Sequence, residues 1–117
     1  MHRRKISAFV IDCRTGNLAD AARFWSEALG RPVRNPDQDG DGRYAELEND
    51  AEEPYLLLQK VDHEARIHID IESEDLDADL ARLESLGAKR IAFVKRWWVM
   101  EAPTGHRFCL IRKKAAG

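Results

Sequence analysis

The fold of this chain is decided by residues 66–93, which read RIHIDIESEDLDADLARLESLGAKRIAF. The first residues alternate between isoleucine and a polar residue, which is the period of a strand with one apolar and one polar face. Leucines then recur at helical spacing from Leu76, with Ser73 or Asp75 as the N-cap. Gly87 ends the helix, and the residues after it begin a second strand. The stretch therefore predicts a strand, a helix and a strand in succession.

The polar face of the first of these strands carries the central candidate residues. If the isoleucines pack beneath the helix, His68 and Asp70 point together to the opposite face of the sheet, where a ligand can bind. A histidine beside a carboxylate can act as an acid/base or hydrogen-bonding pair. Alternation fixes the direction of side chains but not their task. The alternative, in which Asp70 only holds a structural histidine, therefore stays open.

A second strand and helix with the same pattern lie near the N-terminus. Residues 6–13 form a nearly continuous apolar run, as expected of a central strand. Asn17 is the predicted N-cap of a helix whose apolar stripe opens at Leu18 and which ends at Gly30. The helix of residues 66–93 is likewise opened by a leucine and closed by a glycine, so the chain contains an internal repeat.

The rest of the chain adds strands to both copies of the repeat. They are predicted near Val33 and at residues 43–48, 54–61, 96–101 and 106–112. The order that follows is β-α-β-β-β and then β-α-β-β, which gives the α+β class; two such units side by side would form a curved, mostly antiparallel sheet. Helices would cover one side of that sheet and leave a concave cleft on the other, the natural place for a ligand.

Length and charge narrow the classes of function. The 117 residues suffice for one domain. A net charge of -2 gives no reason to expect nucleic acid or an anionic membrane as a partner. No apolar run approaches the roughly 20 residues that a membrane span needs. Cys13 and Cys109 fit a cytoplasmic protein as thiols outside a disulfide.

One short motif matches a calcium-binding pattern. Residues 37–48 satisfy the EF-hand loop consensus, with acidic side chains, a glycine and a final glutamate at Glu48. An EF-hand needs a helix on each side, yet Pro36 precedes the loop and residues 44–47 alternate like a strand. We therefore interpret these residues as a hairpin turn rich in glycine and aspartate.

The chain resembles a glyoxalase/bleomycin-resistance-type protein of the vicinal oxygen chelate superfamily, in particular its compact glyoxalase-like domains. The segments that carry the resemblance are, in order, VIDC, LADAARFWSEALG, YLLLQKV, RIHIDIESEDLDADLARLESLGA and APTGHRFCL. It covers nearly the whole chain. It implies a single domain over residues 1–117, with one βαβββ module at about residues 5–61 and another at about 66–112, and a homodimer.

The resemblance also bears on whether the chain binds a metal ion. Metal-using members hold a divalent ion with His, Glu or Gln side chains from the first, fourth, fifth and eighth strands. The fifth-strand ligand falls on His68, but the first falls near Ala8 and the fourth near Leu57, which carry no donor atom. Cys109 replaces the eighth-strand carboxylate. Two candidate ligands are fewer than the three protein ligands of a usual catalytic zinc, so we expect no metal and no cofactor.

The cleft that the resemblance implies would bring six residues together. His68 and Asp70 are the candidate catalytic pair, and the expected ligand-binding residues are Asp12, Gln59, Trp98 and Cys109. A one-residue slip in strand register would exchange Trp98 for Trp97 at the cleft, and the sequence does not decide between them.

Three functions agree with this reading. The first is binding or sequestering a small organic ligand in a metal-free cleft. The second is a lyase/isomerase-type or dioxygenase-like enzyme that uses His68 as base or metal ligand. The third is a dimerising structural module with a vestigial cleft.

Overall fold

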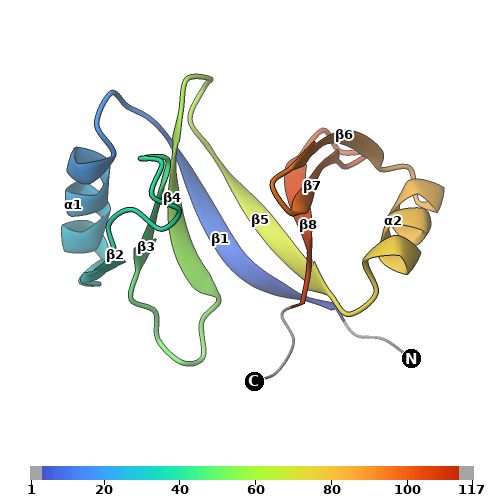
Figure 1. Ribbon diagram of the computed structural model, residues 1–117, viewed down its shortest axis with the longest axis horizontal. Coiled ribbons are helices and arrows are strands. Elements are labelled where there is room, and N and C mark those ends of the chain that lie inside the picture. Colours follow the sequence, from blue (N-terminus) through green and yellow to red (C-terminus); the bar gives the residue numbers. More distant parts are fainter. Residues whose placement is uncertain (1–3, 114–117) are drawn as a thin grey trace. The chain divides into compact units, whose positions relative to one another are not determined.

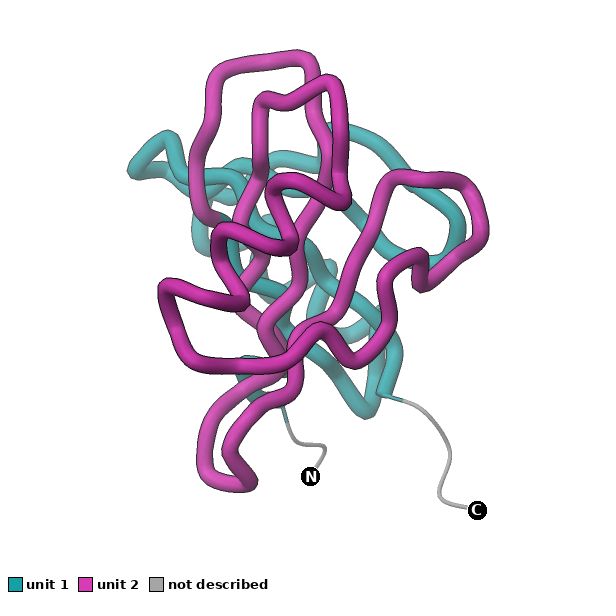
Figure 2. The backbone as a smooth tube through the Cα atoms, turned by 90° about the vertical axis from the view of Figure 1, so that its left-hand side faces the viewer, with its two compact units in different colours: residues 1–7, 68–117 teal, residues 8–67 magenta. Residues whose placement is uncertain are grey.

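The computed structural model describes residues 4–113, which form two compact units (Figure 2). The N-terminal unit comprises residues 8–67, and the C-terminal unit comprises residues 4–7 together with 68–113. The chain passes from one unit to the other inside strands β1 (Arg4–Arg14) and β5 (Arg66–Ser73). Each unit has the order βαβββ, which confirms the predicted α+β class (Figure 1).

The N-terminal unit is a four-stranded sheet with one helix. After β1 come α1 (Leu18–Leu29), β2 (Val33–Asn35), β3 (Tyr44–Leu47) and β4 (Tyr55–Val61). The strand order is β2-β3-β4-β1, with β1 parallel to β4 and the other two pairs antiparallel.

The ends of α1 lie where the sequence predicts them. The side chain of Asn17 accepts a hydrogen bond of 3.2 Å from the backbone N–H of Asp20, which satisfies one N–H that the helix itself leaves without a partner. At the other end Gly30 adopts φ 67°, the left-handed conformation that glycine takes without strain.

The C-terminal unit repeats this arrangement. After β5 come α2 (Leu76–Ser85), β6 (Lys89–Val94), β7 (Trp97–Glu101) and β8 (Arg107–Arg112). The strand order is β5-β8-β7-β6, with β5 parallel to β8 and the other two pairs antiparallel. Of the two predicted N-caps, Asp75 is the one that caps the helix: its side chain accepts a hydrogen bond from the backbone N–H of Ala78. Within residues 4–113 no helix is long and apolar enough to cross a membrane.

In both units the helix covers one face of the sheet and apolar side chains fill the space between them. The core of the N-terminal unit is built from Cys13, Leu18, Ala22, Ala45, Leu47 and Leu58. That of the C-terminal unit is built from Leu76, Leu80, Ala88, Met100, Phe108 and Leu110. Ile69 and Ile71 pack against the second core as predicted, whereas Ile67 is exposed. On the opposite face of each sheet, polar side chains such as Asp12 and Asp70 lie among apolar ones such as Val10 and Val99.

The segment that resembles a calcium loop is the turn of a hairpin. It joins β2 to β3, which pair antiparallel, so a strand lies on each side where an EF-hand would have helices. Within the turn, Oδ1 of Asp37 accepts a hydrogen bond from Gly42 N–H at 2.9 Å. This carboxylate therefore stabilises the turn itself.

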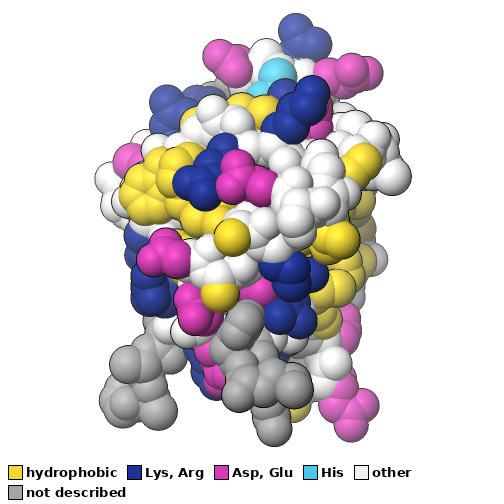
Figure 3. Space-filling view, turned by 90° about the vertical axis from the view of Figure 1, so that its right-hand side faces the viewer, with side chains coloured by type: hydrophobic (Ala, Val, Ile, Leu, Met, Phe, Trp, Pro, Cys, Tyr) yellow, Lys and Arg dark blue, Asp and Glu magenta, His cyan; other side chains and the backbone are white. Residues whose placement is uncertain are grey.

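Strand β6 forms one edge of the C-terminal sheet, and all but the last of its residues are exposed. Ile91 and Phe93 are its exposed large apolar side chains. On the face drawn in Figure 3, hydrophobic side chains lie among basic and acidic ones. Charged side chains such as Lys89 and Arg90 on an edge strand discourage pairing with further strands.

A buried carboxylate ties three segments of the C-terminal unit together. Asp79 of α2 is fully buried; its Oδ1 accepts from Arg4 Nε at 2.9 Å and from Arg82 Nε at 3.1 Å. Its Oδ2 accepts from the hydroxyl of Ser73, at the end of β5, at 2.5 Å. Hydrogen bonds to a charged group are about twice as strong as neutral ones, so this carboxylate fixes α2 to β5 and to the first residues of β1.

We expect Asp79→Ala to lower the free energy of unfolding by about 2–3 kcal/mol, because Ser73 loses its buried partner and both arginines lose their carboxylate. Urea denaturation followed by circular dichroism measures the change. Asp77→Ala, at an exposed position in the same helix turn, should change stability by less than about 1 kcal/mol. Equal losses in the two variants would show that the buried contacts add nothing to stability.

Candidate functional site

Three polar side chains converge on the face of the C-terminal sheet that points away from α2. His68 and Asp70 lie on β5, and Asp70 is the register partner of Cys109 on β8. A ring nitrogen of His68, a carboxylate oxygen of Asp70 and the sulfur of Cys109 all lie within 4.8 Å of one another. Nε2 of His68 is 3.5 Å from Oδ1 of Asp70. The structure thus confirms that the two β5 residues share a face, and it places the thiol of Cys109, another predicted cleft residue, beside them.

The three groups are largely removed from water. The side chains of His68 and Asp70 are 11% and 20% exposed, and Cys109 is 8% exposed. Oδ1 of Asp70 is buried and has no hydrogen-bond partner among the residues that the structure describes. Since a buried polar atom is normally satisfied, this oxygen indicates a place where a ligand group can bind.

The three side chains also offer donor atoms of the kinds that bind a metal ion. A nitrogen, an oxygen and a sulfur equal in number the protein ligands of a typical catalytic zinc. The sequence suggested only His68 and Cys109 as donors, because only these two fall on the ligand positions that the family resemblance implies. Which side chains reach the same point depends on the pairing of β5 with β8, and no local pattern reports that pairing.

The two tryptophans of β7 lie on opposite faces of the C-terminal sheet. Trp98 is the register partner of the buried Leu110 and packs against the core beneath α2. On β7 it also contacts Phe93, at 5.1 Å between ring centroids, and the guanidinium of Arg90, at 5.1 Å. The neighbouring Trp97 therefore shares the face of Cys109, because side chains alternate along a strand. The sequence assigned the aromatic wall to Trp98, and the register offers Trp97 in its place.

Asp12 and Gln59 belong to the N-terminal unit and are register partners on the parallel strands β1 and β4. Both lie on the sheet face opposite α1. Oδ2 of Asp12 lies 3.6 Å from Nε of Arg66, and Nε2 of Gln59 donates to the hydroxyl of Tyr44 at 3.2 Å. The structure therefore places Asp12 and Gln59 side by side. That they contact the same ligand as His68 stays a prediction.

The second cysteine is part of a core. No disulfide joins Cys13 and Cys109, as the sequence predicts. Cys13 packs beneath α1, and burial, with a smaller contribution from the Asp12 carboxylate, raises the pKa of its thiol; a hydrogen bond with Trp25 opposes the shift. A thiol held in its protonated form is a poor nucleophile, so Cys13 is a structural residue.

The comparison with known proteins agrees with this geometry. The family described as "Glyoxalase-like domain" matches residues 8–111. The chain belongs to the glyoxalase-like domain family. The resemblance to a glyoxalase-like domain that was drawn from the sequence is thereby confirmed. No curated protein is significantly similar to the chain in sequence.

Several solved structures have a fold similar to that of this chain. A hypothetical protein from Bacillus halodurans C-125 has a TM-score of 0.70 at 17% identity, and the match covers 97% of this chain and 97% of that one. A Streptomyces coelicolor methylmalonyl-CoA epimerase in complex with 2-nitronate-propionyl-CoA has a TM-score of 0.65 at 21% identity, over 94% of this chain and 97% of that one. The Mn(II)-bound glyoxalase from Novosphingobium aromaticivorans has a TM-score of 0.63 at 18% identity, over 95% of this chain and 42% of that one. At these identities the likeness concerns the fold.

The shifted pKa of Cys13 leads to a prediction about pH. The folded state holds the thiol proton more tightly than the unfolded chain, so stability is fully present below the pKa of the unfolded thiol, about 8.5, and is lost as the pH rises through the folded pKa. Between pH 8 and 10 the free energy of unfolding should therefore fall more steeply for the native protein than for Cys13→Ala. Urea denaturation at a series of pH values measures both slopes, and parallel slopes would contradict the shift.

Proposed function

We propose that this glyoxalase-like protein binds a small organic molecule on the face of the C-terminal sheet formed by β5 and β8. The observation that carries the proposal is the convergence of His68, Asp70 and Cys109 within 4.8 Å of one another. Small-molecule sites combine apolar surroundings with a few polar groups that aim at one point, and these three groups have that arrangement.

The chemistry of the trio limits what it can bind. The carboxylate of Asp70, 3.5 Å from Nε2, favours a histidine that carries a proton on that nitrogen. The other ring nitrogen, Nδ1, is then an acceptor, so His68 can accept a hydrogen bond from a hydroxyl of the ligand or take a proton from it as a base. Trp97 supplies an apolar wall on the same face. A ligand with an oxygen next to an apolar group fits this set best.

A metal-assisted enzyme of the lyase/isomerase type is the second candidate function. Its support is the number of donors. Asp70 raises that number from two to three, so the shortage of ligands no longer argues for a metal-free site. His68, Asp70 and Cys109 would hold the ion. When bound, the ion would polarise a carbonyl of the substrate as a Lewis acid. The set differs from that of metal-using relatives, because Ala8 and Leu57 offer no donor.

The binding proposal is tested by tryptophan fluorescence, since Trp97 lies on the proposed face. We expect saturable quenching by at least one member of a small-molecule panel that includes methylmalonyl-CoA and bleomycin. His68→Ala should weaken that binding at least tenfold, because hydrogen bonds to a charged or polar ligand are lost with the imidazole. His106→Ala, at an exposed turn of the same unit, is the matched control and should bind normally. Equal affinities of the two variants would contradict the proposal, because the ligand would then bind without His68.

The metal content of the purified protein separates the two candidate functions. Elemental analysis is performed on the native protein, His68→Ala and Cys109→Ser after incubation with zinc, manganese and iron(II). One equivalent of ion that is lost in both variants would establish the metal-assisted function. Fewer than about 0.1 equivalents in the native protein, together with ligand binding, would establish a metal-free binding protein.

A further inference from the structure

An arginine that the proposed function leaves unused lies on the same face of the C-terminal sheet as the candidate site. Arg107 precedes Cys109 by two residues on β8, so both side chains project from one face, because side chains alternate along a strand. The parallel register sets Asp70 opposite Cys109. Two residues earlier on both strands, His68 and Arg107 therefore occupy adjacent positions. The candidate site has a guanidinium at its border.

The charge of Arg107 is only weakly engaged within the protein. Its Nη2 lies 3.8 Å from Oε1 of Glu101, the register partner on β7, and the two side chains are 31% and 33% exposed. A pair this long and this open to water is weak, and a guanidinium has several further N–H donors. Glu101 also has Lys89 opposite it on β6. Arg107 can therefore bind an anionic group of a ligand while Glu101 keeps a cationic neighbour.

The opposite end of this face is apolar. Ile111 follows Cys109 by two residues on β8, and its register partner on β7 is Trp97. Val99, which is opposite Cys109, connects these two side chains to the candidate site. All three apolar side chains are half-buried. The four residues from Arg107 to Ile111 span about 13 Å of strand, so a small molecule can lie along them.

The polar groups between these two ends need a hydrogen-bond donor. Oδ1 of Asp70 is buried and accepts no hydrogen bond from residues 4–113. A hydroxyl of a ligand can supply the missing hydrogen, whereas a carboxylate has none and is repelled by the charge of Asp70. Along β8 the face therefore offers a cation, then a place for a hydroxyl, then an apolar surface.

We propose that the ligand of the β5–β8 face is a hydroxy acid with an apolar chain. Its carboxylate pairs with Arg107, its hydroxyl donates to Asp70, and its chain lies along Val99, Ile111 and Trp97. A hydroxyl on the carbon next to the carboxylate fits best, because the positions of His68 and Arg107 are adjacent. The inference rests on the proposed function and adds Arg107 as the residue that selects acids over neutral molecules.

Three ligands with one chain length test this inference by tryptophan fluorescence at pH 7. They are 2-hydroxyoctanoate, octanoate, which lacks the hydroxyl, and 1,2-octanediol, which lacks the carboxylate. The native protein should bind 2-hydroxyoctanoate at least tenfold more tightly than either of the others, since each of them loses a hydrogen bond to a charged group. Equal affinities for 2-hydroxyoctanoate and 1,2-octanediol would contradict the pairing of a carboxylate with Arg107.

Variants of two arginines on β8 locate the carboxylate. Arg107→Gln should bind 2-hydroxyoctanoate at least tenfold more weakly than the native protein and 1,2-octanediol equally well, so that the preference for the acid disappears. The matched control is Arg112→Gln, because Arg112 is an exposed arginine of the same strand on the opposite face. This control should bind all three ligands like the native protein.

Failure of this inference is distinguishable from failure of the proposed function. If another small molecule binds in a His68-dependent manner and 2-hydroxyoctanoate does not bind, the hydroxy-acid inference is wrong and the site stands. Equal affinity of Arg107→Gln and Arg112→Gln for 2-hydroxyoctanoate has the same meaning. If Arg107→Gln does not fold, the comparison of the three ligands with the native protein decides. Binding of no small molecule at all would overturn both.

Discussion

The rest of the structure depends on the parallel pairing of the first and last strands of each βαβββ module. In the C-terminal unit this pairing places Asp70 opposite Cys109, and in the N-terminal unit it places Asp12 opposite Gln59. Two parallel strands cannot be joined by a tight turn, so a crossover must carry the chain from the end of one to the start of the other. The helix and the two antiparallel strands of each module are that crossover. The helix covers one face of the sheet, and the candidate site residues lie on the other.

The two copies of the repeat share one order of strands and helix but carry different side chains at the equivalent positions. Asp12 and Asp70 precede the first residue of their helices, Leu18 and Leu76, by the same number of positions. At the strand position two residues earlier, the N-terminal copy has Val10 where the C-terminal copy has His68. Opposite the aspartate, the N-terminal copy has an amide and the C-terminal copy a thiol. The same backbone geometry thus sets an aspartate opposite an amide in one unit, and brings a histidine, an aspartate and a thiol together in the other.

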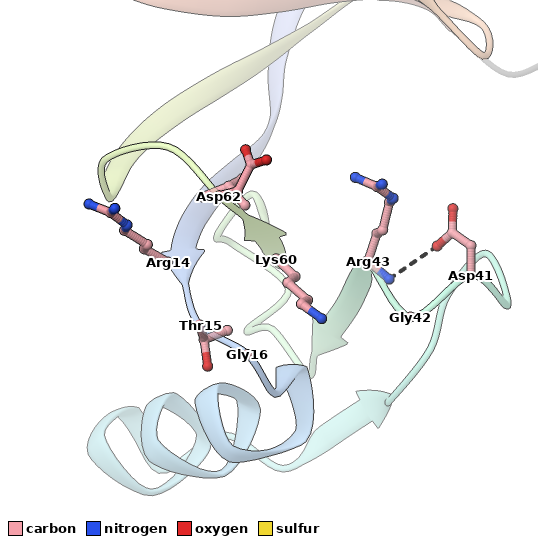
Figure 4. Close-up of a pocket in the computed structure, with 9 residues that line it drawn as sticks. Arg14, Thr15, Gly16, Asp41, Gly42, Arg43, Lys60 and Asp62 are labelled. Carbon is pink, nitrogen blue, oxygen red and sulfur yellow. Dashed lines mark hydrogen bonds between the residues drawn. The ribbon is translucent and has the colours of Figure 1, made fainter.

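The edge of the N-terminal sheet shows the same pairing from its other end. Where β1 and β4 finish together, their last residues and the turn before β3 line a cavity of about 550 Å³. Lys60 extends into it between the Gly16 turn and Gly42 (Figure 4).

The sequence by itself determined every element of this fold. Alternating isoleucines, caps such as Asn17 and Asp75, and the glycine at the end of α1 act over a few residues, and their effect can be read from their neighbours. It also determined the family and the shared face of His68 and Asp70, since alternation is a property of a single strand. The family resemblance led us to expect Cys109 in the same cleft. Only the tertiary structure decided that its sulfur lies within 4.8 Å of the other two groups and that Trp97 rather than Trp98 lies on their face. These depend on the register between strands that are distant in the chain. A shift of one residue would exchange the two faces, and the contacts that fix the register form only when the chain is folded.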